Sequence, residues 1–382
     1  MKTTIAFIAL LIVSSSRADQ TYPGTSTRPI LNSAEASDYT KTSYLQGWLP
    51  ETISTTAADF TVGGSGGFST IQEAVNAAIN TKSSNRQYIK INTGKYSQVV
   101  YIPNTDVPLT IYGTSDVVIS LSVSALLTGT EYQTLVGGLF APGDPAYETY
   151  VKCAIRTAIG TTCSSVFWVK AANVELINLT IENSSKNVGT DQAVALNINA
   201  DKVQVSNSRL LGHQDTLYAG SGKSKTLRNY FFNTYVEGDV DFVFGHASAV
   251  FEQCTFHVKD DRRNYSGIVF APSTNPNNQY GYLVVGGTIT GDGSWFRSQN
   301  VYLARSWDAG VKSEANYIAG TSPNGQLVIR DTKIDAVVIN LAPYNKAATS
   351  GRKFAGNNNT NRNLSDNNFN RFWEFNNSGS GA

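Results

Sequence analysis

Two short stretches decide the fold and the chemistry of this chain: Gly212-His213-Gln214-Asp215-Thr216-Leu217-Tyr218 and Asp239-Val240-Asp241-Phe242-Val243-Phe244-Gly245. Each is predicted to be a short β-strand, and Asp215 and Asp241 are 26 residues apart, near the repeat length of a stacked-strand solenoid. Adjacent strands in such a stack lie roughly 4.8 Å apart. The two carboxyl groups are therefore expected to face one another across one step of the stack. Because two carboxyl groups that close do not both ionise easily, one should stay protonated beside a charged partner, which indicates a hydrolase.

Apolar runs recur through the chain at irregular spacing, as expected when loops of variable length leave a constant stack. Hairpin signals are sparse, with one Asn324-Gly325 late in the chain, so a parallel β-helix is favoured over an all-β sandwich, which stays open. Several runs share a small or polar residue in one register. The runs are Val174–Ile181, Val203–Leu210, Tyr230–Val236, Val250–Phe256, Tyr282–Ile289 and Gln326–Ile334, and the shared residues are Asn178, Asn207, Asn233, Cys254 and Asp331.

One amphipathic helix is predicted ahead of the strands, with Ser69 and Gln72 as a capping box at its start. A single helix in this position suits a plug over the open end of a solenoid, where it hides unpaired strand edges. Residues 19–58 lack a clear period and are predicted to be an extended arm that wraps the body. The apolar face of the helix is formed by Ile71, Ala74, Val75, Ala78 and Ile79.

Composition points to a secreted protein. The chain has 382 residues, a formal net charge of +1 and 15% charged residues, which gives no indication of a nucleic-acid or polybasic membrane partner. The first residues fit a signal peptide, with Lys2, an apolar core from Ile5 to Val13, and the small-x-small site Ser16-Arg17-Ala18. The apolar run is too short to span a bilayer. We predict secretion; the alternative is that these residues form an N-terminal strand of the mature fold.

The three cysteines allow at most one disulfide. Cys153 and Cys163 bracket a short loop and are the predicted pair in an oxidising compartment, whereas Cys254 lies in an apolar run and is predicted to be buried. Three cysteines and three scattered histidines argue against a zinc site. Asn-x-Ser/Thr sequons would be glycosylation acceptors in a eukaryotic host, and they occur at Asn178, Asn183, Asn264, Asn358, Asn363 and Asn376.

Four motifs occur in order along the chain. They are Gln192-Ala193-Val194-Ala195-Leu196, the two aspartate stretches, and Leu303-Ala304-Arg305-Ser306-Trp307. Together they resemble the signature of the pectin methylesterases (pectinesterases), carbohydrate esterases with a right-handed parallel β-helix fold. The likeness extends from Phe60-Thr61-Val62 to the closing segment at 374–379. The segment 141–147, with the loop between the two paired cysteines, is most similar to the bacterial-type branch of the family.

The resemblance implies a role for each matching residue. Asp241 matches the nucleophile and Asp215 the general acid/base. Arg305 matches the residue that pairs with the nucleophilic carboxylate, and Gln192 and Gln214 match the donors to the oxyanion. The aromatic residues that contact sugar rings in the family's groove match Tyr218, Phe244 and Trp307.

Elementary chemistry supports the same roles. Ester hydrolysis passes through a tetrahedral oxyanion, which the neutral amide N–H groups of Gln192 and Gln214 can stabilise without quenching a nearby carboxylate. Arg305 can hold Asp241 ionised through a bidentate contact. Asp215, left beside a negative neighbour, is pushed toward its protonated form. It can then give its proton to departing methanol and later take one from water.

The residues alone leave alternatives. Asp239 lies two positions from Asp241 and so shares its face of a strand, which makes it the main rival nucleophile. Arg305 can be a surface cation instead, and the three matching aromatic residues can belong to the core. The family's usual Leu-Gly-Arg-Pro-Trp is changed here, since Ala304 replaces Gly and Ser306 replaces Pro. Both changes alter the backbone freedom around the arginine.

The sequence therefore predicts a secreted, monomeric pectin methylesterase that acts on methyl-esterified pectin and releases methanol. We expect no metal or other cofactor, no nucleic-acid partner and no membrane partner. The predicted organisation is a signal peptide at 1–18, the arm at 19–58 and one catalytic β-helix domain at 59–382. Three alternatives stay open: a glycoside hydrolase or lyase on the same scaffold, an esterase of another acyl substrate such as a thioester, and a catalytically idle carbohydrate-binding solenoid.

Overall fold

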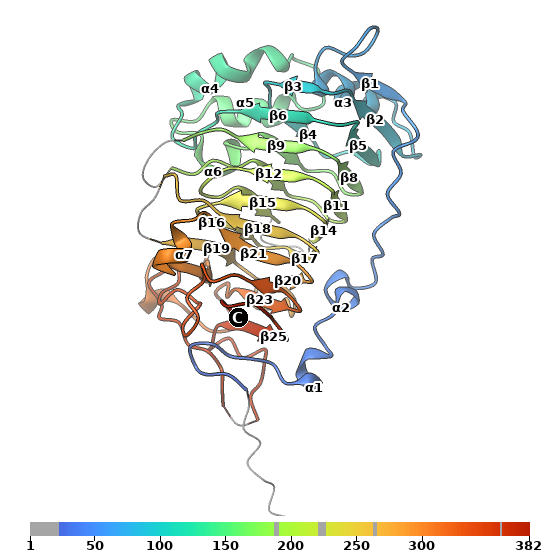
Figure 1. The fold of residues 1–382 in the computed structure, drawn as a ribbon. Coiled ribbons are helices and arrows are strands. Elements are labelled where there is room, and N and C mark those ends of the chain that lie inside the picture. The colour runs from blue at the N-terminus through green and yellow to red at the C-terminus, as the bar shows by residue number, and fades with distance from the viewer. Residues whose placement is uncertain (1–22, 187–190, 221–226, 263–265, 360) are drawn as a thin grey trace, which may run out of the picture.

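The computed structural model describes residues 23–382 except 187–190, 221–226, 263–265 and 360. Its strands form three parallel sheets that run along the molecule, because the chain coils and contributes strands to each sheet in turn (Figure 1). This arrangement confirms the predicted right-handed parallel β-helix and excludes the sandwich. The predicted signal peptide at 1–18 and the sequon at Asn264 lie outside the described residues.

The three sheets contain ten, seven and eight strands. The ten-stranded sheet is β1 (Phe60–Val62), β2 (Gln87–Ile91), β5 (Leu109–Gly113), β8 (Val174–Ile177), β11 (Val203–Ser206), β14 (Arg228–Phe232), β17 (Ser248–Glu252), β20 (Tyr282–Val285), β23 (Gln326–Arg330) and β25 (Arg371–Phe375). The seven-stranded sheet is β4 (Val100–Ile102), β7 (Phe167–Val169), β10 (Leu196–Ile198), β13 (Leu217–Ala219), β16 (Val240–Gly245), β19 (Gly267–Pro272) and β22 (Val301–Ala304). The eight-stranded sheet is β3 (Gly94–Tyr96), β6 (Val117–Leu121), β9 (Thr180–Asn183), β12 (Arg209–Leu211), β15 (Tyr235–Gly238), β18 (Thr255–Val258), β21 (Thr288–Gly291) and β24 (Lys333–Ile334).

The predicted apolar runs each cover two strands and the tight corner between them. The corner residue has a left-handed backbone, which Asn, Asp and Gly tolerate better than other residues. Cys254, predicted for this register, lies one residue past the corner and is buried, so Gln253 takes the corner position instead. The corner residues have φ between 46° and 66° and are Asn178, Asn207, Asn233, Gln253, Gly286, Asp331 and Asn376.

The inside of the coil is filled with apolar side chains that stack from one coil to the next. Phe231 and Phe251 stack with ring centroids 4.6 Å apart, and Phe251 meets Phe256 at 5.6 Å. All three are fully buried, and burying a side chain of this size stabilises a fold by about 1.5–3 kcal/mol. This continuous core holds the outward-facing residues of the sheets in fixed register.

Helix α3 (Ile71–Asn80) closes the N-terminal end of the stack. Its N-cap is Thr70 paired with Glu73, one residue later than the predicted Ser69 and Gln72. Gln72 is instead buried and docks on the edge strand β4, where its side chain accepts from the N–H of Tyr101 at 2.7 Å and donates to the Tyr101 carbonyl at 3.0 Å. The helix therefore satisfies a strand edge that would otherwise invite pairing with another chain.

The N-terminal arm runs along the outside of the ten-stranded sheet (Figure 1). It contains two short helices, α1 (Ser33–Ala36) and α2 (Lys41–Leu45). Tyr44 and Leu45 are buried in an apolar cluster formed with outward-facing residues of the sheet. At the far end of the stack, Arg28 binds Glu374 at 2.9 and 2.7 Å. The arm thus ties the last coil to the body.

The remaining helices lie on loops that leave the coils. The pair α4 and α5 covers one side of the N-terminal end, and the predicted Cys153–Cys163 disulfide is present and joins α5 to α6. These elements are α4 (Gly129–Val136), η1 (Gly137–Leu139), α5 (Tyr147–Ala154), α6 (Gly160–Cys163), α7 (Trp295–Ser298) and η2 (Glu314–Asn316).

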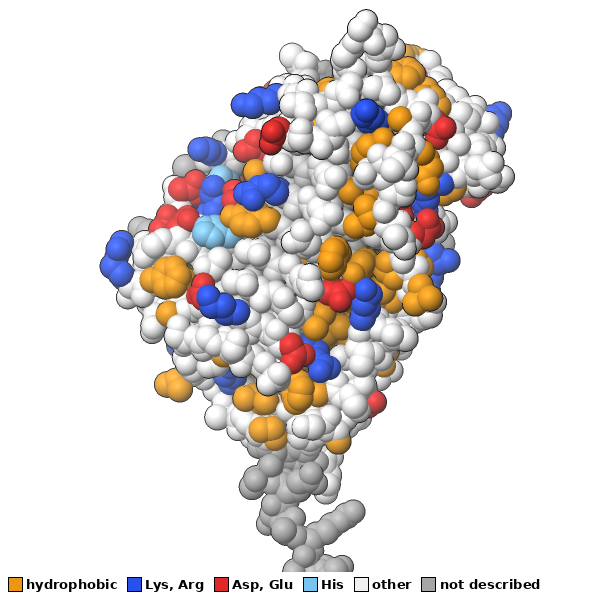
Figure 2. All heavy atoms as spheres, turned by 45° about the vertical axis from the view of Figure 1, so that its right-hand side comes forward, with side chains coloured by type: hydrophobic (Ala, Val, Ile, Leu, Met, Phe, Trp, Pro, Cys, Tyr) orange, Lys and Arg blue, Asp and Glu red, His pale blue; other side chains and the backbone are white. Residues whose placement is uncertain are grey.

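The surface carries few charges, and many of them are paired. On the face shown in Figure 2, acidic and basic side chains lie mostly next to one another on a broad uncharged surface. Ion pairs at the surface of the described residues include Arg330 with Asp331 at 2.8 Å and Lys41 with Glu252 at 2.7 Å. Paired charges of this kind give this face no extended field of one sign.

Candidate active site

Asp215 and Asp241 lie on neighbouring coils of the seven-stranded sheet. Asp215 is in the turn before β13, since the strand predicted over 212–218 begins only at Leu217, and Asp241 is the second residue of β16. The N–H of Asp215 donates to the carbonyl of Val240 at 3.3 Å, so the two aspartates are one step apart. Both have left-handed backbones, with φ of 68° and 50°, and β16 shifts register against β19 just after Val240. Such irregularities re-aim side chains, and here both carboxyl groups line one cleft.

Arg305 binds the Asp241 carboxylate from the side. Its Nε lies 2.8 Å from Oδ1 and 3.1 Å from Oδ2 of Asp241, and Nη2 also donates to Oδ2. The arginine follows β22, where its N–H is fixed on the Phe270 carbonyl at 3.0 Å. The Asp241 side chain is 10% exposed and that of Arg305 26%, so the pair is reachable from solvent. A bidentate guanidinium favours the charged carboxylate and fixes its orientation.

Asp215 is the more deeply buried of the two carboxyl groups, with 3% of its surface exposed. Burial raises the pKa of Asp215 well above its ordinary value, and the negative charge of Asp241 raises it further, while the Arg305 guanidinium opposes both effects. The raised pKa favours the protonated form of Asp215, whose carboxyl group lines the same cleft as the carboxylate of Asp241.

Gln192 and Gln214 follow one another on successive coils, because the N–H of Ala193 donates to the Gln214 carbonyl at 3.1 Å. Both side chains line the cleft with the two aspartates. The hydroxyl of Thr161 donates to Oε1 of Gln192. Since the oxygen of this amide is engaged, its NH₂ group is the end that can donate to a bound substrate.

Three aromatic side chains form the wall of the cleft on the side of Arg305. Tyr218 stacks on Phe244 with ring centroids 4.2 Å apart, and Trp307 meets these rings at 5.9 and 5.6 Å. They belong to a small apolar cluster separate from the interior of the coil. Tyr218 and Phe244 are stacked because they occupy the same register of β13 and β16. The cluster offers an apolar surface against which a sugar ring can pack.

The cleft that gathers these groups has a volume of about 510 Å³. It contains every predicted site residue: Gln192, Gln214, Asp215, Tyr218, Asp241, Phe244, Arg305 and Trp307. The rival Asp239 does not line it. Arg262 binds Asp239 through Nε at 2.7 Å and Nη2 at 3.0 Å, and the two side chains are 1% and 4% exposed.

Known proteins share this architecture. A family model described as "Pectinesterase" matches residues 138–313. A pectinesterase of Sitophilus oryzae is 56% identical over 99% of this chain and 100% of its own length. The chain belongs to the pectinesterase family. The solved structure of rice weevil pectin methyl esterase superposes with a TM-score of 0.93 over 95% of this chain and 100% of that one. An Escherichia coli relative named as the putative acyl-CoA thioester hydrolase YbhC is 37% identical over 96% of this chain and 91% of its own length.

Five cleft residues of this pectinesterase-family chain were missed by sequence reasoning. They are Arg156, Thr161, Thr162, Ala271 and Thr349. The first three lie between the paired cysteines. The predicted disulfide indicated that these residues form a loop, but it did not indicate that the loop packs against the cleft. Ala271 stands in register with Phe244, which pattern reasoning on β19 could have revealed. Thr349 comes from a long C-terminal loop that carries no sequence signal for the site.

The departure from the family's usual Pro at position 306 has a structural explanation. Ser306 donates to Asp308 at 2.8 Å and accepts from the N–H of Gly325 at 3.0 Å. Asp308 is in turn bound by Arg352 at 2.9 Å through two nitrogens. These buried bonds fix the loop after Arg305 in place of a rigid proline ring. Ala304 is fully buried in β22.

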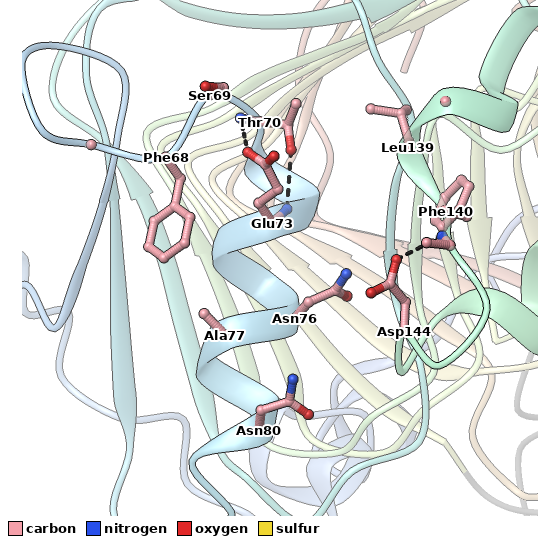
Figure 3. A pocket seen from close by; sticks show the side chains of 13 residues that line it. Phe68, Ser69, Thr70, Glu73, Asn76, Ala77, Asn80, Leu139, Phe140 and Asp144 are labelled. Atoms are coloured by element: carbon pink, nitrogen blue, oxygen red, sulfur yellow. Dashed lines mark hydrogen bonds between the residues drawn. The ribbon is translucent and has the colours of Figure 1, made fainter.

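A larger cleft of about 720 Å³ lies elsewhere, between α3 and the segment 138–144 (Figure 3). Its two carboxylates serve the local backbone. Glu73 accepts from the N–H of Thr70 at 2.9 Å, and Asp144 accepts from the N–H of Ala141 at 2.8 Å. The candidate active site is therefore chosen by the two carboxyl groups and the arginine that line it, and not by the size of the cleft.

In the part of the chain that the structure describes, no helix is both long enough and apolar enough to cross a bilayer.

Cys254, outside the disulfide, is fully buried as predicted, and burial raises the pKa of its thiol to about 12.

Proposed function

We propose that this member of the pectinesterase family removes methyl esters from the galacturonosyl units of pectin, with Asp241 as the nucleophile and Asp215 as the general acid/base. The observation that carries the proposal is the bidentate Arg305–Asp241 pair beside a buried carboxyl whose pKa is raised, in one solvent-accessible cleft. An ionised carboxylate and a protonated one on adjacent coils supply the two functions that ester cleavage needs.

In the first half-reaction the Asp241 carboxylate attacks the carbonyl carbon of the methyl ester. The amide groups of Gln192 and Gln214 donate to the oxyanion that develops. When this intermediate collapses, the bond to the methoxy oxygen breaks and Asp215 gives it a proton, so methanol leaves. The substrate acyl group is then joined to Asp241 as a mixed anhydride.

In the second half-reaction Asp215, now ionised, takes a proton from water. The resulting hydroxide adds to the substrate carbonyl carbon, and the bond to Asp241 breaks. The products are a galacturonic acid unit and the original protonation states of both aspartates. Arg305 stabilises Asp241 again as it becomes a leaving carboxylate. The whole cycle consumes one ester and one water and needs no redox partner.

The experiment compares methanol release from methyl-esterified pectin by the native chain and by Asp241→Asn. The variant keeps the shape of the side chain and removes its charge, so activity should be lost while circular dichroism and thermal unfolding stay close to those of the native protein. Native-like methanol release by a folded Asp241→Asn variant would exclude the proposed nucleophile. New reducing ends or unsaturated products without methanol would identify a glycoside hydrolase or lyase instead.

A second candidate is hydrolysis of an acyl-CoA thioester, favoured by the name of the Escherichia coli relative. The same anhydride chemistry applies to a thioester, but the apolar wall of Tyr218, Phe244 and Trp307 then faces a different acyl group. Thiol release from acyl-CoA substrates, measured beside methanol release from pectin, separates the two activities. We further propose that the chain is secreted as a monomer, with residues 59–382 as its catalytic domain.

A further inference from the structure

One end of the cleft is built by the loop that the Cys153–Cys163 disulfide closes. The loop is fixed at several points: Gly129 donates to the carbonyl of Arg156 at 2.8 Å, and Ile159 donates to the Leu127 carbonyl at 2.8 Å. At its end Thr161 donates to Gln192, the proposed oxyanion residue. This wall is therefore a preorganised part of the site, and its side chains meet any polymer that lies in the cleft.

Arg156 is the cation of this wall. Its side chain lines the cleft, and Nη1 donates to the carbonyl of Ile159 at 3.1 Å. Within the described part of the chain, no carboxylate lies within ion-pair distance of it. The other two arginines near the aspartates are each occupied, Arg305 by Asp241 and Arg262 by Asp239. Arg156 thus presents a guanidinium that the protein itself leaves without a counter-charge.

The position of Arg156 along the cleft differs from that of the reacting group. Asp241 lies on β16, whereas the loop of Arg156 leads into β7, which is three strands away in the sheet. Strand spacing puts β16 and β7 roughly 14 Å apart along the coil axis, while the side chains of Asp241 and Arg156 line one cleft. A polysaccharide that lies in this cleft with one unit over Asp241 can therefore place a neighbouring unit near Arg156.

We propose that Arg156 binds the free carboxylate of a galacturonate unit near the one whose ester is cleaved. This inference rests on the proposed function. De-esterified units are the anionic groups of such a polymer, and each turnover of the reaction creates one. A guanidinium presents paired N–H donors that match a carboxylate in geometry and charge.

The test compares two homogalacturonan substrates of equal length, one fully methyl-esterified and one half esterified. The variants are Arg156→Gln, Arg156→Lys and the control Arg297→Gln, which removes an exposed arginine that does not line the cleft. Arg156→Gln should raise KM for the half-esterified substrate roughly fivefold, with kcat unchanged, because a charge-assisted contact to bound substrate is lost. KM for the fully esterified substrate should change by less than about twofold, since that polymer has no carboxylate to bind.

Arg156→Lys should raise KM for the half-esterified substrate less than Arg156→Gln does, by roughly twofold to threefold, because the ammonium keeps the charge but loses the paired N–H donors, and Arg297→Gln should match the native chain. The fivefold difference should also shrink in 0.5 M salt, which screens an exposed contact. An equal rise in KM on both substrates would overturn the proposal and assign Arg156 a role in loop structure, and so would unchanged KM values. A native chain that releases no methanol from either substrate would instead reject the proposed function itself.

Discussion

Asp239 and Asp241 are two residues apart, and an arginine binds each of them side-on, yet the two pairs lie in different surroundings. The Asp239–Arg262 pair is 1% and 4% exposed, whereas the Asp241–Arg305 pair is 10% and 26% exposed and lines the cleft. The chemical groups are the same. What differs is the backbone, which is left-handed at Asp241, and the carboxylate of Asp241 lines the cleft. The buried Asp239–Arg262 pair can contribute to the stability of the coils, whereas the partly exposed Asp241–Arg305 pair is accessible to a substrate in the cleft.

The largest expected effect comes from neutralising each carboxylate in turn. Asp241→Asn should lower kcat/KM for methyl-esterified pectin by a factor of about 10⁴ or more, because it removes the nucleophile, and leave unfolding almost unchanged. Asp239→Asn should destabilise the fold by about 3–5 kcal/mol, because it removes the carboxylate that the buried Arg262 binds. Urea unfolding and methanol release measure both quantities. A stable, inactive Asp239→Asn variant together with an active Asp241→Asn variant would reverse the assignment.

Replacing the two arginines by lysine tests the geometry of the pairs without removing their charge. Arg305→Lys should lower kcat/KM by about 10–100-fold, since one ammonium cannot fix both carboxylate oxygens, with little loss of stability at this partly exposed site. Arg262→Lys should cost roughly 2–3 kcal/mol of stability and leave kcat near native in the folded fraction. Equal losses of activity in the two variants would show that the buried pair also shapes the site.

Asp215 provides a pH-dependent contrast with the other two aspartates. Its folded-state pKa is raised, so between its unfolded pKa, about 3.9, and that raised value the folded chain binds more protons than the unfolded chain. The contribution of Asp215 to stability therefore falls as pH rises through this range. Asp215→Asn should be inactive but more stable than the native chain at pH 7, by on the order of 1 kcal/mol, with a smaller gain at pH 4. Urea unfolding at the two pH values decides this, and a gain that is larger at pH 4 would contradict the raised pKa.

The smallest expected effect concerns the loop that carries Arg305. Ser306→Ala removes the bonds to Asp308 and to the N–H of Gly325 and should cost about 1–2 kcal/mol of stability. Activity should fall less than about threefold, because the backbone bond from Arg305 to Phe270 remains. A loss of activity as large as that of Arg305→Lys would mean that Ser306 takes over the orienting role of the family's usual proline.

The sequence predicted the coil, the disulfide and eight of the cleft residues because these depend on local patterns and ordered motifs. Apolar runs, a short loop between cysteines and four ordered motifs can all be read along the chain. The choice between Asp239 and Asp241 could not be made on residue spacing, since the irregular backbone at Asp241 breaks the alternation that spacing assumes. Corner and cap positions were each misplaced by one residue, at Gln253 and Thr70, for a related reason: neighbouring polar residues compete for one conformation.

Residues from distant loops were beyond prediction for a different reason. Arg156 and Thr349 line the cleft but belong to long loops that leave the coil. No sequence periodicity predicts where such loops pack. The motifs predict the candidate catalytic residues, whereas the loops supply the residues that surround them.

The arm also sets an order of events during protein synthesis. Its residues precede the coils in the chain, but Arg28 binds Glu374 of β25, and Tyr44 packs in a cluster that includes Trp373. Docking of the arm must therefore wait until β25 has been made. A chain cut short before its last coil would leave both the arm and the outer apolar strip of the ten-stranded sheet uncovered. Such unfinished products would expose more apolar surface than chains that include the last coil.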